Sequence, residues 1–300
     1  MRMRPFLPIV LAAAVAVLAP SALAGTPKAD ELLARSAAAL KQKDTLHLDL
    51  EAHTTTKTDG TLTAAQVRKL VPPIDISAHG DLSPKTIVLA AKLTAGAQAL
   101  AGELRLSGTE LYVNLFGTWY GTKDASAKGN GGLSLDLKPK ELTGSLGDLL
   151  GNGMQAKVTA GPEVDGVETW KLTGSFEGPA LTKALKSTGA TTNAKVVLRL
   201  AEKADVTILI GQDDDLPRRL EILTTLNGPD LATASATTQG LVPLPKSGTK
   251  GLKSVTVSIV VQLSKFGQKV AFERPAKFKP LEKMIDALLG GLGGSSTTTK

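Results

Sequence analysis

The feature that most constrains this chain is an alternation of apolar and polar residues, repeated in many short segments. The longest such series contains Val255, Val257, Ile259, Val261 and Leu263. Successive side chains of a strand point to opposite faces of a sheet, so this period of two predicts strands with one buried face and one polar face. The chain is therefore expected to build a large β-sheet.

The full pattern predicts about ten antiparallel strands with a few helices between them. Apolar residues recur at helical spacing from Ala29 to Lys41, and a short helix is expected from Leu62 to Val71, before Pro72 and Pro73. Further helices are expected over 139–150, 179–187 and 281–289, a strand or a helix over 194–202, and a flexible tail over 290–300. A sheet of this size tends to curl and needs cover on its apolar face. We therefore expect one α+β domain over residues 25–289, a curved antiparallel sheet covered by helices.

Residues 1–24 have the composition of an export signal. Arg2 and Arg4 precede an apolar run from Leu7 to Leu18, and Ala22-Leu23-Ala24 supplies the small residues of a cleavage site. The apolar run is shorter than the ~20 residues that a membrane-spanning helix needs. We expect export and cleavage after Ala24, which places the protein in the cell envelope or outside the cell; an uncleaved anchor is the alternative.

The composition offers little material for catalysis. The chain has no cysteine, only three histidines and 3% aromatic residues, which excludes disulfides, thiolate nucleophiles and zinc–cysteine sites. It has no Gly-x-Ser-x-Gly motif and no glycine-rich phosphate loop. We predict no catalytic residue, no metal and no cofactor. A hydrolase of envelope polymers stays open as an alternative, because distant carboxylates can form a pair.

Two polar clusters were candidates for metal binding. The first occupies one face of a predicted strand and contains His47, Asp49, Glu51 and His53. The rise of a strand spreads its two histidines about 20 Å apart, too far to share an ion, so a solvated outer face is expected. His79 stands alone. The second cluster, Asp213 to Asp215, lacks the spacing and glycine of a calcium loop and indicates a charged hairpin turn.

Positive charge gathers near the C-terminal end. Residues 250–283 contain eight Lys or Arg and two Glu. The few aromatic residues are dispersed and do not make a base-stacking surface, so nucleic acid is not expected. Anionic lipid headgroups attract each well-placed Lys or Arg by about 1 kcal/mol. The expected membrane-docking residues are Lys265, Lys269, Arg274, Lys277 and Lys279; a merely solvated strand face is the alternative.

The order of four motifs resembles the LolA/LppX-like superfamily. Thr45 to Leu50, after the first helix, is similar to the opening of that family, and Gly108 to Trp119 is similar to its strand–turn–strand ending in tryptophan. Asp213 to Leu220 looks like its late hairpin. Leu263 to Gly267, with Val270 and Pro275, resembles the last strand pair of the actinobacterial LppX/LprAFG lipoproteins.

This resemblance implies a half-barrel closed by helices over an apolar cavity, in proteins that carry lipids or lipidated proteins across the envelope. Gly25 stands where family members commonly have a lipidated cysteine, which implies a soluble form. The inward strand faces would line the cavity. The expected lining residues are Leu89, Leu93, Leu104, Leu106, Leu111, Val113, Trp119, Trp170, Val257, Ile259 and Val261.

The sequence thus predicts an exported, non-enzymatic lipid-binding or lipid-transfer protein, monomeric, with a lipid or lipidated molecule and an anionic membrane surface as partners. The alternative is an envelope sensor or interaction module of the same fold, which would bind an extracytoplasmic segment of a membrane protein. The two hypotheses differ in the cavity, because the same Ala-, Leu- and Val-rich strands would also suit a filled core.

Overall fold

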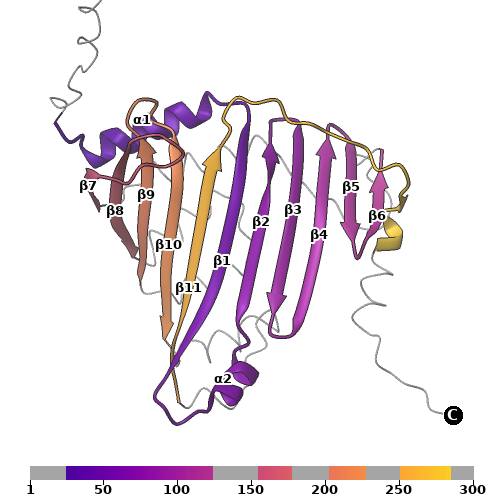
Figure 1. Ribbon diagram of the computed structural model, residues 1–300, viewed down its shortest axis with the longest axis horizontal. Coiled ribbons are helices and arrows are strands. Elements are labelled where there is room, and N and C mark those ends of the chain that lie inside the picture. Colours follow the sequence, from indigo (N-terminus) through magenta and orange to yellow (C-terminus); the bar gives the residue numbers. More distant parts are fainter. Residues whose placement is uncertain (1–24, 124–154, 178–202, 228–250, 285–300) are drawn as a thin grey trace, which may run out of the picture.

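The computed structural model describes residues 25–123, 155–177, 203–227 and 251–284, which contain one curved sheet of 12 strands (Figure 1). In chain order the elements are α1 (Ala29–Lys41), β1 (Leu46–Thr58), α2 (Ala64–Leu70), β2 (Ile74–Leu82), β3 (Thr86–Ala95), β4 (Gln98–Ser107), β5 (Glu110–Leu115), β6 (Thr118–Thr122), β7 (Gln155–Ala160), β8 (Thr169–Glu177), β9 (Lys203–Gly211), β10 (Pro217–Asn227), β11 (Leu252–Ser264) and β12 (Lys279–Pro280). The predicted export signal, the elements expected over 139–150, 179–187 and 194–202, and the tail lie outside the described residues.

The strands are ordered β12-β6-β5-β4-β3-β2-β1-β11-β10-β9-β8-β7. Every neighbouring pair is antiparallel except β12 and β6, which run parallel. The expectation of about ten strands, all antiparallel, was therefore wrong in number and in this one pairing. Strand β12 has only two residues, Lys279 and Pro280. It is therefore too short to show the alternation of apolar and polar residues that predicts a strand.

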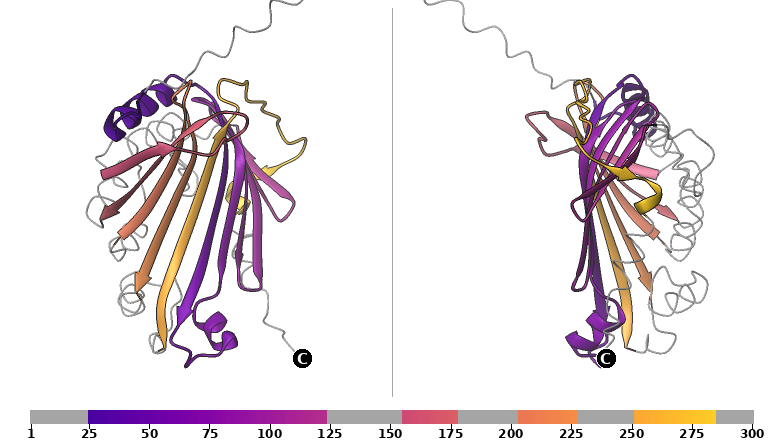
Figure 2. Two further views of the ribbon diagram at one scale, coloured as in Figure 1. Left: turned by 60° about the vertical axis from the view of Figure 1, so that its left-hand side comes forward. Right: turned by 90° about the vertical axis from the view of Figure 1, so that its right-hand side faces the viewer.

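The first and last long strands pair with each other in the middle of the sheet. In their antiparallel register Leu50 lies opposite Val261, and Ala52 lies opposite Ile259. The apolar residues of both strands therefore share one face, and the meander β2–β6 and the strands β10–β7 extend from this central pair on either side. Figure 2 shows the sheet curling, with α1 on its concave side.

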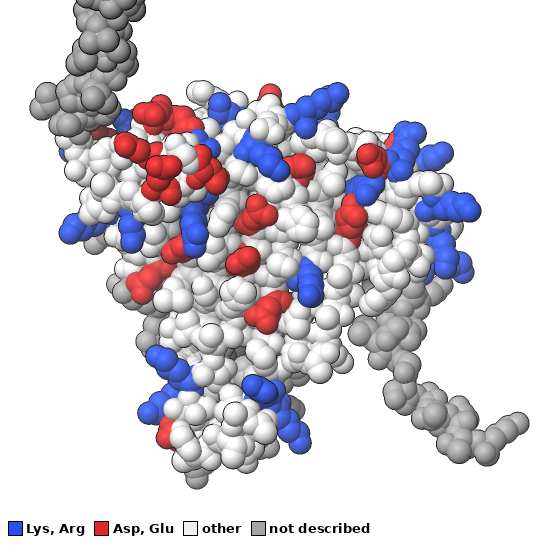
Figure 3. Space-filling view, viewed as in Figure 1, with Lys and Arg blue, Asp and Glu red and all other residues white. Residues whose placement is uncertain are grey.

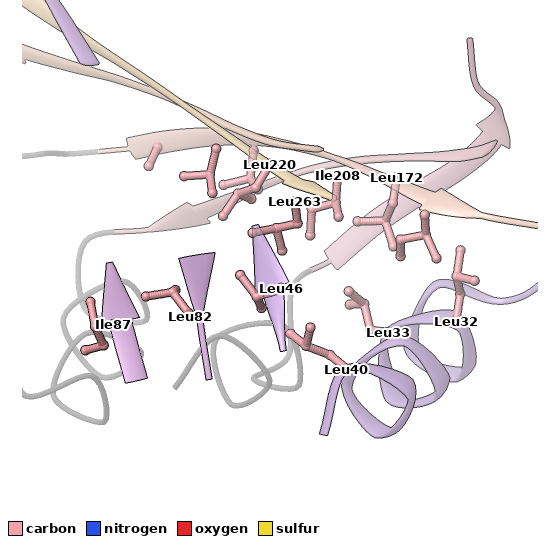
Figure 4. Close-up of a cluster of buried hydrophobic side chains, with 14 of the residues drawn as sticks. Leu32, Leu33, Leu40, Leu46, Leu82, Ile87, Leu172, Ile208, Leu220 and Leu263 are labelled. Carbon is pink, nitrogen blue, oxygen red and sulfur yellow. The ribbon is translucent and has the colours of Figure 1, made fainter. Parts of the chain in front are cut away.

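Helix α1 has the bounds that its apolar spacing predicts. Its buried side chains are Leu32, Leu33, Ser36, Ala37 and Leu40. In Figure 4 these leucines point toward strand residues that include Leu46, Leu172 and Ile208, in one buried cluster. Burial of this stripe, rather than intrinsic helix propensity, supplies most of the stability of a helix of this length.

The helical cover within the described residues is small. They contain only two helices longer than a turn, α1 and α2. Helix α2 lies within the predicted 62–71 segment and begins with a capping box, in which Thr63 and Gln66 satisfy each other's backbone amides. Neither helix has the length and apolar character to cross a bilayer.

The hairpin turn predicted at Asp213 to Asp215 is confirmed, and a second tight turn joins β7 to β8. Asp165 and Gly166, between β7 and β8, both have positive φ angles, of 51° and 78°, as a tight hairpin turn requires. Between β9 and β10, the carboxylate of Asp214 accepts a hydrogen bond from the Leu216 amide at 3.0 Å and forms an ion pair with Arg218. The acidic run is thus part of a hairpin.

Residues 265–280, which we call the C-terminal strap, run from β11 to the far edge of the sheet (Figure 1). The Gly267 amide donates to the Thr45 carbonyl at 3.0 Å, and Arg105 donates to the Glu273 carbonyl at 2.7 Å. The strap ends as β12 beside β6, so it covers an edge that would otherwise expose unpaired backbone groups.

Tyr112 of β5 anchors the strap on the convex face. Its ring is fully buried and lies 6.3 Å from the Phe272 ring and 5.0 Å from the Phe278 ring, centroid to centroid. Gly121, opposite Tyr112 on β6, leaves room for the ring, because a Cβ there would lie 2.3 Å from its Cδ1 atom. The aromatic contacts hold the strap against the sheet.

We expect leucine substitutions in the packed helix α1 and on the partly exposed strand β3 to have unequal effects on stability. Leu40→Ala, at a fully buried position of α1, should lower the free energy of unfolding by about 2–5 kcal/mol. Leu93→Ala is the matched control: Leu93 is 39% exposed, so the loss should stay below about 1 kcal/mol. Urea unfolding followed by circular dichroism measures both, and equal losses would contradict the packing described above.

Candidate functional site: the concave face of the sheet

The concave face carries the apolar member of each alternation. On β1 these residues are Leu46, Leu48, Leu50 and Ala52, and on β11 they are Val255, Val257, Ile259, Val261 and Leu263. Cross-strand neighbours on β2, β3 and β4 continue the rows; one row runs through Ile76, Leu93 and Leu100. The result is a continuous apolar surface across the middle of the sheet.

Ten of the eleven side chains predicted to line a cavity belong to this face. They are Leu89, Leu93, Leu104, Leu106, Leu111, Val113, Trp170, Val257, Ile259 and Val261. Trp119 belongs to the convex face, because it pairs with Asn114 and not with Val113. There the guanidinium carbon of Arg105 lies 4.6 Å from the centroid of the Trp119 ring, a cation–π contact.

Burial on the concave face is uneven and does not follow the distance from α1, because Leu111 on β5 and Val255 near the other end of β11 are also buried. Leu46 on β1 and Ile87 on β3 are each only 2% exposed. A pocket bordered by Leu40 of α1 and Leu263 of β11 has a volume of about 10 Å³, too small for a ligand larger than water. Several other apolar side chains of the face are only partly buried: Leu48, Leu50, Leu89, Leu104, Val113, Ile222 and Ile259. Ile76 and Leu93, which pair with each other, are 37% and 39% exposed.

A pocket of about 470 Å³ lies at the α2 end of the same face; we call it the α2 pocket. Its lining residues are Thr54, Thr56, Thr58, Leu62, Ala64, Val67, Arg68, Val71 and Pro73. The Ile74 amide donates to the Thr54 hydroxyl at 2.8 Å, and the Asp59 amide donates to the Gly251 carbonyl at 3.0 Å. These bonds fix the loop and helix that form one wall of the pocket against the strands that form the other.

The three histidines lie on the convex face, each opposite an aspartate in the register of β1 and β2. His47 Nδ1 is 2.6 Å from an Asp81 oxygen, and His53 Nδ1 is 2.9 Å from an Asp75 oxygen. Because these two histidines contact different aspartates, they are not brought together. Within the described ranges, no three potential metal ligands form a group that could hold an ion.

The pKa of His53 is raised above its ordinary value. The main cause is the hydrogen bond to Asp75, and the charges of Asp75 and Glu51 act in the same direction. The side chain is half exposed, so solvent screens these charges. A raised pKa means that the folded protein binds the proton more tightly than the unfolded chain does.

The predicted docking residues all lie on the C-terminal strap, in exposed positions. Arg274 forms an ion pair with Glu110, and hydrogen bonding to Arg274 lowers the pKa of the Glu110 carboxyl. Burial is the main cause that raises the pKa of the neighbouring Tyr112 phenol. The other four are lysines without an ion pair in the described part of the chain: Lys265, Lys269, Lys277 and Lys279. Arg274 thus holds the strap in place, whereas the lysines are exposed to the solvent.

A second depression, of about 410 Å³, lies mainly on the convex face and includes Asp205 and Glu221 in its lining. These are the carboxylates that the hydrolase alternative would need at a cleft. Glu221, however, accepts a hydrogen bond from Arg219 at 2.6 Å within the same depression. The α2 pocket has no carboxylate in its lining. Neither depression therefore contains two carboxylates that are both free of a hydrogen bond to another side chain.

We expect the His53–Asp75 pair to be measurable by pH titration. The pKa of His53 in the folded protein should lie above 6.5, and Asp75→Asn should lower it toward that value. The stabilisation from this pair is fully present below about pH 6.5 and is lost as the pH rises through the folded pKa. NMR titration of the His53 ring protons tests the shift; the same pKa in wild type and variant would contradict it.

No protein-family model and no curated protein matches this chain. Solved structures similar to it include LprF from Mycobacterium bovis, with a TM-score of 0.48 and 14% identity over 84% of this chain and 100% of that chain. Another is the lipoprotein LppX from Mycobacterium tuberculosis, with a TM-score of 0.41 and 19% identity over 82% of this chain and 98% of that chain. Both names are among those that the sequence resemblance suggested.

Proposed function

We propose that this protein is an exported, non-enzymatic lipid carrier of the bacterial cell envelope, which holds acyl chains against the concave face of its sheet. The observation that carries this proposal is a group of apolar side chains on that face that are not fully buried. Leu104 is only partly buried and Leu93 is 39% exposed, although both belong to the continuous apolar surface. An apolar surface of this kind, in a concave sheet, fits an apolar ligand.

The energetics favour an aliphatic ligand. Each buried CH₂ is worth about 0.8 kcal/mol, so removing a 16-carbon chain from water gains on the order of 12 kcal/mol. The partly buried side chains are mainly Leu, Val and Ile, which offer aliphatic contacts along the length of a chain. A flexible acyl chain does not require the close shape match that a rigid ring system would need. A chain that is loosely contacted can also be released.

Release and uptake require contact with a membrane, and the C-terminal strap is suited to it. Lys269, Lys277 and Lys279 are exposed on a segment that the Tyr112 cluster and the Arg274–Glu110 pair fix to the sheet. Fixed lysines attract an anionic surface without a folding step. We therefore include an anionic membrane among the partners of the protein, in peripheral contact.

We expect a charged substitution on β4 to affect lipid retention only when it lies on the concave face. Leu104→Glu places a charge among apolar side chains and should abolish retention of a bound lipid, while the fold survives because Leu104 is only partly buried. Ala101→Glu, on the convex face of the same strand, is the matched control and should retain lipid. Native mass spectrometry of protein from its own host, with extraction of the ligand, measures both.

Three outcomes of that experiment are informative. A stoichiometric lipid in wild type and Ala101→Glu, absent from Leu104→Glu, supports the carrier. Equal retention in all three proteins would contradict the concave site. A wild-type protein that is empty and takes up no fluorescent acyl probe would overturn the proposal and favour the alternative, a module that binds a membrane protein.

Membrane contact is expected to depend on where the lysines lie. Replacing Lys269, Lys277 and Lys279 together by glutamine should weaken binding to vesicles of anionic phosphatidylglycerol by up to about 3 kcal/mol, roughly a hundredfold. Replacing Lys92, Lys157 and Lys171, on the convex face, removes the same charge and should have a much smaller effect. Vesicle sedimentation at physiological salt tests this, and equal losses for the two triple variants would argue against a docking strap.

A further inference from the structure

The concave row of β1 changes chemistry along its length. It begins with Leu46, Leu48, Leu50 and Ala52 and continues, on the same face, with Thr54, Thr56 and Thr58. The exposed apolar residues Ile76 and Leu93 lie in the same cross-strand row as Ala52, directly before the first threonine. The aliphatic surface therefore leads into a hydroxyl-lined region, which is the α2 pocket.

The polar groups of the α2 pocket are available to a ligand. Thr54 is engaged with the Ile74 backbone, but the hydroxyls of Thr56 and Thr58 have no hydrogen-bond partner among the described residues. Arg68, exposed on α2, has no carboxylate partner there either. Arg219, which lines the depression on the convex face, differs from Arg68 because it forms an ion pair with Glu221.

The surroundings of the α2 pocket are positively charged. Figure 3 shows Lys and Arg side chains on both sides of this end of the molecule. The basic residues of its strands and helix are Lys57, Arg68, Lys69 and Lys253. The nearby carboxylate of Asp59 is engaged with the amide and hydroxyl of Thr61, at 2.9 and 2.6 Å, and not with Arg68. The pocket therefore has an excess of positive charge.

We infer that the α2 pocket binds the anionic headgroup, a phosphate or a carboxylate, of an acyl lipid whose chain lies along the concave face. This rests on the proposed function and names its ligand class. The planar guanidinium of Arg68 can donate two parallel hydrogen bonds to a phosphate or carboxylate, and the Thr56 and Thr58 hydroxyls supply further donors. The adjoining Ile76 and Leu93 would contact the first methylenes of the chain.

The experiment compares two probes that share a chain and differ in charge. Isothermal titration calorimetry, below the critical micelle concentrations, gives the Kd of palmitoyl lysophosphatidic acid and of monopalmitoylglycerol. Wild type should bind the phosphate-bearing lipid about tenfold more tightly, since charge-assisted hydrogen bonds are the stronger kind. Arg68→Gln should reduce this preference to about one, with little change for monopalmitoylglycerol. The double variant Thr56→Val/Thr58→Val should reduce it in part.

Lys69→Gln is the matched control, because Lys69 is the next residue of the same helix, is also exposed and does not line the pocket. It should keep the preference. Loss of the preference in both variants would overturn the inference, since it would reflect net charge alone. Equal Kd values for the two probes in wild type would also overturn it while leaving the carrier intact. Failure of wild type to bind either probe would instead contradict the proposed function.

Inorganic phosphate, titrated alone, separates the two possible sources of the anion. Weak binding or none, with tight binding of lysophosphatidic acid, is expected when the chain supplies most of the free energy. Binding of free phosphate as tight as that of the lipid would overturn the assignment to a headgroup and indicate a site for the free anion.

Discussion

The pairing of β1 with β11 is the contact on which the remaining structure depends. It joins the first strand of the sheet to its last long strand, which are separated by most of the chain. Both strands are 13 residues long, and in their register the apolar residues of one lie beside those of the other. The meander that follows β1 and the strands that precede β11 then add on opposite sides, so one pairing places two halves of the chain on a common apolar face.

A shift of this register by one residue would exchange the two faces of β1. Because side chains alternate, a slip of β1 would move Leu48 and Leu50 to the face that now carries Asp49 and Glu51. The present register leaves the histidine–aspartate pairs on the convex face, where solvent reaches them, and the aliphatic surface on the concave face. The polarity of the two faces thus depends on the register of β1 with both of its neighbours, β11 and β2.

Features with a local period could be predicted from the sequence, and features made by distant contacts could not. The bounds of α1 and the shared face of ten predicted lining residues follow from spacing alone. Trp119 differs because the turn at Phe116 and Gly117 sets which face a five-residue strand presents, and no alternation in β6 fixes it. The strap depends on Tyr112 meeting Phe272 and Phe278 across the convex face, which no local pattern contains. The threonines of the α2 pocket were visible in the sequence, but their meeting with Arg68 required the fold.

The uneven burial of the concave face assigns stability and ligand binding, which usually compete, to different groups of side chains. A fully packed core stabilises a fold but leaves no room for a ligand, and an empty apolar cavity costs stability in proportion to its size. Here α1 and the strand ends beneath it, with Leu40 and Leu172 fully buried, provide the close packing. The region around Leu93 lies in a ladder of strands whose backbone pairing is complete on both sides, so its side chains can stay exposed without loosening the sheet. A surface built this way can be apolar, open and stable together, because the hydrogen bonds that hold it do not depend on what covers it.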